Sequence, residues 1–175
     1  MSAQIDHQLI TTTDGVNLHV ARRGTGPPVV LLHGFPENWT SWRHQMAPLA
    51  EAGFTVLAPD LRGYNDSGAP EGLEPYAIDH LVSDVAAIVQ STPQGRAHIV
   101  GHDWGGIIAW HFAAAHPELT GSLAILNAPH PSVFLRRVRR PPQLFRSWYA
   151  AFFQLPVLPE AALRAFDFAA IRRLF

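Results

Sequence analysis

The segment Gly101-His102-Asp103-Trp104-Gly105-Gly106 places a carboxylate between two glycines, at a point where a buried strand should meet a helix. The apolar run 97–100 before it is typical of a short strand, and residues 106–115 after it are typical of a helix. A strand that turns into a helix within two residues forces the turn residue into a strained conformation and needs small neighbours. This pattern predicts a nucleophile elbow that presents the Asp103 side chain in a pocket.

An aspartate at this position favours a different chemistry from the serine that is usual at such an elbow. A carboxylate is a weak acyl nucleophile, but it can displace a leaving group from saturated carbon and form an alkyl-enzyme ester, which water must then cleave. Epoxides and carbon–halogen bonds are suitable electrophiles, whereas Asp103 disfavours a serine-type esterase. The structural alternative is that Asp103 is only the N-cap of the following helix.

The strands and helices that must position Asp103 are expected to alternate along the chain. Residues 8–13 and 16–22 flank Asp14-Gly15, which predicts an opening hairpin. Four apolar runs are typical of buried strands: 29–32, 54–58, 97–100 and 122–126. Helices are expected over 42–52, 76–90 and 106–115. Alternating strands and helices predict an α/β fold, with a mostly parallel sheet covered by helices on both faces.

Two loops should follow strands at the same edge of the sheet as Asp103. The first buried strand is followed by His33-Gly34-Phe35-Pro36-Glu37. The Phe35 backbone N–H can therefore join that of Trp104 as an oxyanion hole. The alternative is that this segment is simply a tight loop. In the loop 59–64, we expect Asp60 and Arg62 to be structural and to satisfy the loop backbone and each other.

The composition limits the classes of protein to which this chain can belong. A length of 175 residues suits one domain. The net charge of −1 gives no reason to expect binding to nucleic acid. The absence of cysteine excludes disulfides and thiolate chemistry. The N-terminus lacks a signal-peptide pattern, and no apolar run is long enough to span a bilayer, so we expect a soluble cytoplasmic protein.

The pattern of residue types along the sequence changes from Pro129 onward. We expect residues 1–131 to be the N-terminal part of the core and residues 132–175 to be the start of a helical cap, inside which the chain stops. The arginines within 136–140 lie near aromatic residues and could suggest contact with a membrane surface or nucleic acid. We favour a solvated face of cap helices whose aromatic residues line a pocket.

Six motifs occur in an order that resembles the epoxide hydrolase branch of the α/β-hydrolase fold: HGFPE, SWRHQ, APDLRGY, GHDWGG, LNAPHP and WYAAFFQLP. The resemblance implies that Asp103 is the nucleophile and that Phe35 and Trp104 supply the oxyanion N–H groups. It also implies that Tyr149 hydrogen-bonds the epoxide oxygen, unless this tyrosine is only a core aromatic of the cap. Residues expected to line the substrate pocket are Trp104, Trp148 and Phe152.

The departures from this family concern the second half of the reaction. Such enzymes need a histidine base, an acid that orients it and a second cap tyrosine, and we expect all three beyond residue 175. His33 and His102 are interpreted as structural, and His130 belongs to the proline-rich start of the cap. Asn65 stands where a glycine is more usual. The sequence thus predicts a fragment with an exposed apolar edge strand at 122–126, able to trap an electrophile once but not to turn over.

Two other functions remain open. A haloalkane dehalogenase would share the aspartate and the fold, and Trp104 or Trp148 could hold a halide, but the apolar Phe35 favours the epoxide hydrolase and Trp104 argues against the haloacid type. The second alternative is a non-catalytic remnant that serves as an interaction module. The expected substrate is a small apolar epoxide, and neither a cofactor nor a metal is implied.

Overall fold

The computed structural model describes residues 4–138 and Arg164. The chain divides into two compact units, residues 1–128 and residues 129–175. The first unit holds the sheet and the elbow. In the second, the described helix is α4 (Pro131–Val138). Whether this second unit begins a helical cap at residue 132 stays a prediction.

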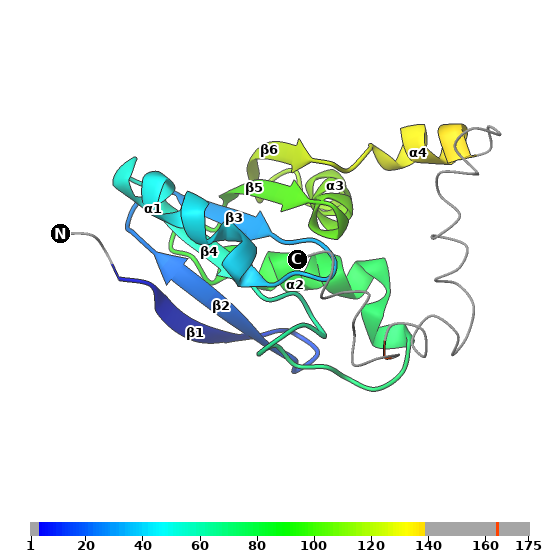
Figure 1. The fold of residues 1–175 in the computed structure, drawn as a ribbon, viewed down its shortest axis with the longest axis horizontal. Coiled ribbons are helices and arrows are strands. Elements are labelled where there is room, and N and C mark those ends of the chain that lie inside the picture. The colour runs from blue at the N-terminus through cyan, green and yellow to red at the C-terminus, as the bar shows by residue number, and fades with distance from the viewer. Residues whose placement is uncertain (1–3, 139–163, 165–175) are drawn as a thin grey trace. The chain divides into compact units, whose positions relative to one another are not determined.

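The chain opens with a hairpin, as its sequence predicts. Strands β1 (Asp6–Thr11) and β2 (Asn17–Arg23) are antiparallel, and Gly15 in their connecting turn has a φ of 83°. The remaining strands of this sheet are β3 (Pro28–Leu32), β4 (Thr55–Pro59), β5 (Ala97–His102) and β6 (Thr120–Leu126). Within residues 4–138 they form one sheet in the order β1-β2-β4-β3-β5-β6, in which β4, β3, β5 and β6 are parallel (Figure 1).

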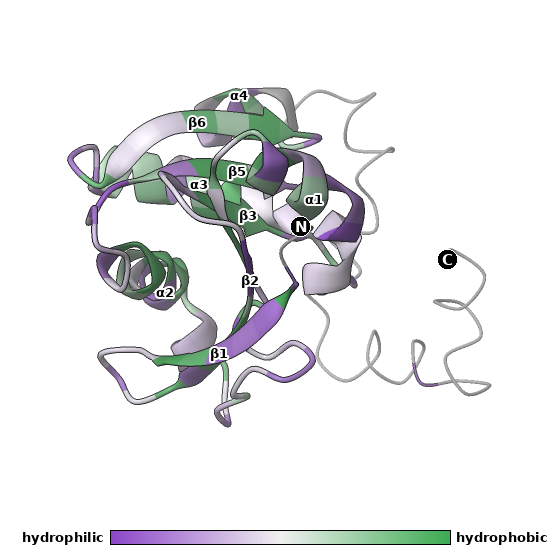
Figure 2. Ribbon diagram, turned by 90° about the vertical axis from the view of Figure 1, so that its left-hand side faces the viewer, coloured by the Kyte–Doolittle hydropathy of each residue, from purple (hydrophilic) through white to green (hydrophobic). Residues whose placement is uncertain are grey.

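Helices lie on both faces of this sheet (Figure 2). On one face, α1 (Arg43–Glu51) and the 3-10 helix η1 (Trp39–Trp42) bury Met46 and Trp42 against side chains of β2, β3 and β4. On the other, α2 (Ile78–Gln90), which follows the short η2 (Glu74–Tyr76), and α3 (Trp104–Ala115) pack on side chains of β2, β3, β4 and β5, such as Val30 and Ile99. The buried runs of β3 and β4 need this cover on both faces.

The predicted fold class is confirmed, and the expected strands and helices of residues 4–128 are present. The main difference is that α3 begins at Trp104, two residues before the expected start, because the chain turns directly from strand into helix. No helix among residues 4–138 is both long and apolar enough to cross a membrane.

Candidate active site

Asp103 occupies a strained turn between β5 and α3. Its φ of 50° and ψ of −115° are rare for a residue that carries a side chain, and such strain is typical of functional positions. A Cβ on Gly101 would overlap the backbone of Gly105, and a Cβ on Gly105 would overlap the carbonyl oxygen of Leu32. The glycines on either side of Asp103 are therefore required by the close approach of backbone, as expected for an elbow.

The Asp103 carboxylate is exposed and does not cap the helix that it precedes. Although Asp103 stands at the N-cap position of α3, its side chain makes no capping hydrogen bond. Its Oδ1 instead accepts a hydrogen bond of 3.0 Å from the Phe35 N–H, whereas Oδ2 accepts none from a described residue. The N-cap interpretation is thus wrong for the side chain, and one carboxylate oxygen has no hydrogen-bond donor among the described residues.

One backbone donor binds this carboxylate, and a second follows Asp103 directly in the chain. The Phe35 N–H already binds Oδ1, and the Trp104 N–H is in the first turn of α3, where a backbone donor has no acceptor within its own helix. The side chains of Phe35 and Trp104 are 48% and 41% exposed. The structure therefore brings Phe35, Asp103 and Trp104 together at the carboxyl ends of β3 and β5. The exposed rings of Phe35 and Trp104 give this part of the molecule apolar surface.

His33 fixes the start of the Phe35 loop. Its Nε2 accepts a hydrogen bond from the Leu61 N–H (2.9 Å), so Nδ1 carries the proton and donates to the Gly34 carbonyl (2.8 Å). The ring is fully buried, and burial lowers the pKa of His33 below its ordinary value. With both nitrogens engaged and the neutral form favoured, His33 is structural.

Glu37 joins the same loop to the residue before the nucleophile. Its Oε2 accepts a hydrogen bond from the Gly34 N–H (3.3 Å) and lies 3.4 Å from His102 Nδ1. The other nitrogen of His102 lies 3.3 Å from the Asn127 amide, just after β6. His102 therefore connects the loop after β3 with the loop after β6, which agrees with a structural interpretation.

Tyr64 approaches the site from the loop after β4. Its ring packs edge-on against His33, with centroids 4.9 Å apart. Burial, together with the nearby Asp103 charge, raises the pKa of Tyr64 to about 12. The phenol therefore stays protonated near the carboxylate at neutral pH.

Arg62 pairs with partners that the sequence does not suggest. It is 2% exposed, and its guanidinium donates to Asp84 at 2.9 and 2.6 Å and to Asp14 at 2.7 and 3.0 Å. The expected pairing of Asp60 with Arg62 is wrong, because Asp60 turns toward β2 while Arg62 turns toward α2. Arg62 thus joins the hairpin turn to α2 and stays away from Asp103.

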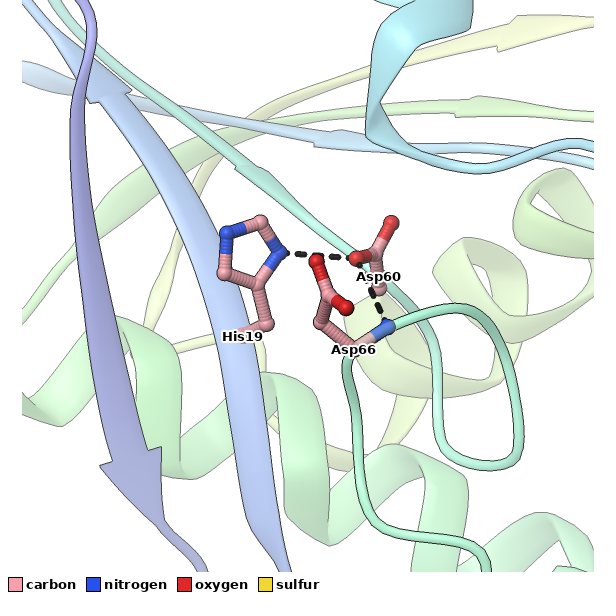
Figure 3. A group of neighbouring side chains, drawn as sticks. All are labelled: His19, Asp60 and Asp66. Carbon is pink, nitrogen blue, oxygen red and sulfur yellow. Dashed lines mark hydrogen bonds and ion pairs between the residues drawn. The ribbon is translucent and has the colours of Figure 1, made fainter.

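Asp60 is the centre of a second cluster, in which His19 and Asp60 are buried and Asp66 is exposed. Figure 3 shows His19, Asp60 and Asp66, whose potential metal-ligating atoms lie within 4.8 Å of one another. The Oδ1 of Asp60 accepts from the Trp39 N–H (2.9 Å), and its Oδ2 accepts from His19 Nδ1 (2.7 Å) and Asn65 Nδ2 (2.8 Å). Because protein donors satisfy both oxygens, we interpret the cluster as structural. Asn65 has a φ of 43°, which asparagine tolerates better than most residues, and this explains its presence where glycine is usual.

Three predicted site residues, Tyr149, Trp148 and Phe152, lie outside the described residues. His130 lies just before α4, where its Nδ1 accepts a hydrogen bond from the Ser132 N–H.

Sequence reasoning missed the contact between Glu37 and His102 and the burial of Asp84. The second had a signal: Asp84 falls on the apolar face of α2 between Leu81 and Val85, where a charge needs a buried partner.

The comparisons with known proteins agree with this geometry. A sequence model of the alpha/beta hydrolase fold matches residues 27–168. The chain is 48% identical over 160 residues to the AB hydrolase superfamily protein YfhM of Bacillus subtilis, covering 89% of this chain and 56% of that protein. It is 44% identical over 164 residues to Epoxide hydrolase 4 of Mus musculus, covering 92% of this chain and 45% of that protein.

Solved structures give the same result. The crystal structure of epoxide hydrolase VrEH1 from Vigna radiata matches with a TM-score of 0.79 and 40% identity, over 90% of this chain and 50% of that one. The chain therefore spans about half the length of the relatives it matches. On its motifs, its elbow and these similarities, the chain belongs to the α/β-hydrolase fold family and, within it, to the epoxide hydrolase branch.

Proposed function

We propose that Asp103 attacks a carbon of an epoxide and forms an alkyl-enzyme ester, the first half of epoxide hydrolysis to a vicinal diol. The observation that carries the proposal is the exposed carboxylate on a strained elbow, in which Oδ1 accepts from the Phe35 N–H and Oδ2 accepts from no residue of the described chain. Membership of the epoxide hydrolase branch supports the class of electrophile.

The hydrogen bond to Oδ1 assigns different roles to the two carboxylate oxygens. The lone pairs of Oδ2 attack the epoxide carbon, a carbon–oxygen bond of the three-membered ring breaks, and its electrons move to the epoxide oxygen. The resulting alkoxide takes a proton. On the family resemblance we propose Tyr149 as the donor.

The second step would use the same backbone donors. When water attacks Cγ of the ester, negative charge develops on Oδ1, which the Phe35 N–H already binds and which the Trp104 N–H can also approach. The bond from Cγ to Oδ2 then breaks, the diol leaves with Oδ2, and one water oxygen stays in Asp103.

This second step also needs a base that accepts a proton from water. Two histidines belong to the elements around Asp103: His33 has both ring nitrogens hydrogen-bonded, and the nitrogens of His102 face Glu37 and Asn127. We therefore propose that residues 1–175 form the ester without sustained turnover.

The flanking side chains favour an apolar substrate. Phe35 and Trp104 place exposed aromatic surface beside Asp103, and burying that surface against an apolar epoxide would stabilise the complex. On the family resemblance, we propose Trp148 and Phe152 as further residues that contact the substrate.

Intact-protein mass spectrometry after incubation with styrene oxide tests the proposal. The parent chain should gain one substrate mass, the adduct should persist, and Asp103→Ala should gain none. A parallel incubation with a primary bromoalkane tests the dehalogenase alternative. An adduct with the bromoalkane alone would indicate that Asp103 attacks a carbon–halogen bond and not an epoxide. Folded chain that reacts with neither would support the non-catalytic remnant.

A further inference from the structure

A cavity of about 260 Å³ lies at the end of the sheet opposite to Asp103. It adjoins the amino ends of β3 and β4, whereas Asp103 follows the carboxyl end of β5, which is parallel to β3 (Figure 1). Its buried side is formed by Pro28, Thr55 and Leu57. One water molecule takes up about 30 Å³ in the liquid, and pockets for drug-sized ligands measure about 300–1,000 Å³. The cavity therefore suits a small ligand, and it is separate from the candidate active site.

Hydrogen bonds hold the lining of this cavity in place. Thr55 Oγ1 donates to the Gly26 carbonyl (2.9 Å), which joins the loop between β2 and β3 to β4. A Cβ on Gly26 would overlap the carbonyl oxygen of Gly53, so this loop lies tightly against the neighbouring backbone. Two further lining residues, Ser91 and Thr92, donate their hydroxyl groups to carbonyls in the last turn of α2. The cavity is therefore preformed, and the hydroxyl groups of three lining residues are already engaged.

Arg22 lines the cavity, and its half-buried guanidinium has no partner within the described chain. In the register of the hairpin Arg22 lies opposite Asp6, and opposite charges at such cross-strand positions usually attract each other. The two side chains nevertheless form no ion pair. Arg43 and Arg96, by contrast, each donate to a backbone carbonyl. The five N–H donors of Arg22 therefore remain available to a ligand in the cavity.

The other polar residues of the lining add donors without adding negative charge. Gln8, Thr25 and Gln94 each bring a side-chain amide or hydroxyl group that is not hydrogen-bonded to a described residue. None of the described lining residues is acidic. Carbonyls in the last turn of α2 would themselves attract a guanidinium, but the hydroxyl groups of Ser91 and Thr92 occupy two of them. The lining therefore carries one positive charge and no negative one.

We propose that this cavity binds an oxyanion, namely the phosphate or carboxylate group of a small molecule. A guanidinium presents two parallel N–H donors that match two oxygens of such a group, so Arg22 would bind it in a bidentate manner. The hydroxyl group of Thr25 and the amide of Gln94 would donate to its remaining lone pairs. The ligand differs in class from an uncharged epoxide, and the proposal does not depend on the chemistry of Asp103.

Nuclear magnetic resonance titration of the isotope-labelled chain tests the proposal, with inorganic phosphate and succinate as separate probes at constant ionic strength. The backbone amide resonances of Gly26 and Gln94 should shift and saturate with at least one probe. Saturation with one probe alone assigns either phosphate or carboxylate as the preferred group. Arg22→Gln should weaken binding by about tenfold or more, because the charged hydrogen bonds are lost. The matched control Arg43→Gln removes the same charge outside the cavity and should bind like the parent.

Two further variants separate the contributions to binding. Arg22→Lys keeps the charge but loses the paired donors, so it should weaken binding by about threefold. Gln94→Ala changes an exposed loop residue and should also weaken binding by about threefold, which provides the comparison if Arg22→Gln does not fold.

Shifts that grow linearly with probe concentration, or that sodium chloride reproduces, would overturn the proposal. So would an affinity equal to that of the parent in both Arg22 variants. Asp103→Ala should bind the probes like the parent, so a failure of alkylation and a failure of anion binding are distinguishable.

Discussion

Replacing Gly34 by alanine should slow the alkylation of Asp103 by about 100-fold. The added Cβ would lie 2.7 Å from the Asp103 Cβ and 2.9 Å from Oδ1, whereas non-bonded carbons settle about 3.5–4.0 Å apart. The loop and the nucleophile must therefore separate by about 1 Å. This shift would break the 3.0 Å hydrogen bond from the Phe35 N–H to Oδ1, and a misplacement of this size costs on the order of 100-fold in rate.

The assay is the time course of adduct formation with styrene oxide, followed by intact-protein mass spectrometry. Overpacking should also lower the free energy of unfolding, by about 1–3 kcal/mol, so the rates are compared at a temperature where both proteins are folded. Gly121→Ala is the control, because its added Cβ would meet nothing closer than 3.2 Å and lies at the far end of β6. Alkylation of Gly34→Ala at the parent rate would refute the role given to this close contact.

Three further substitutions test the scaffold. Arg62→Met should lower the free energy of unfolding by about 3–5 kcal/mol, because it leaves Asp84 buried without its partner; urea denaturation measures this, and a loss below 1 kcal/mol would contradict the pairing. His80→Gln should lower the melting temperature at pH 5.5 but not at pH 8.5. The hydrogen bond to Glu74 raises the pKa of His80 above 6.5, so its stabilisation is present below that pH and is lost as the pH rises through the folded value; an equal effect at both pH values would count against it. Gly105→Ala should prevent stable folding of the elbow, since its Cβ would overlap backbone oxygens, and native-like circular dichroism with an unchanged melting temperature would show otherwise.

The sheet could be predicted from the sequence because each strand carries a local signal. The apolar runs of β3 and β4 indicate burial on both faces, and Gly101 and Gly105 mark a turn that only small residues permit. Because the loops that follow parallel strands meet at the same ends of those strands, the loop after β3 was expected beside Asp103, where the structure has it. The catalytic roles of Asp103, Phe35 and Trp104 stay predictions, as does every role given to residues outside the described chain.

The partners of buried charges could not be predicted in the same way. Arg62 contacts Asp14 and Asp84, which lie 48 and 22 residues away, so their pairing depends on how the hairpin and α2 pack on the sheet. Neighbours in sequence were therefore a poor guide, as the mistaken pairing of Asp60 with Arg62 demonstrates. A charge on an apolar helix face, as at Asp84, is the local signal that would have corrected it.

The central claim is that Asp103 is a nucleophile toward saturated carbon, and tandem mass spectrometry of peptides from the styrene oxide-treated chain tests it most directly. We expect the added mass to reside on Asp103 and on no other carboxylate, and Asp103→Ala to yield an unmodified peptide map. Modification of an exposed carboxylate such as Asp66, with Asp103 unmodified in folded protein, would contradict it.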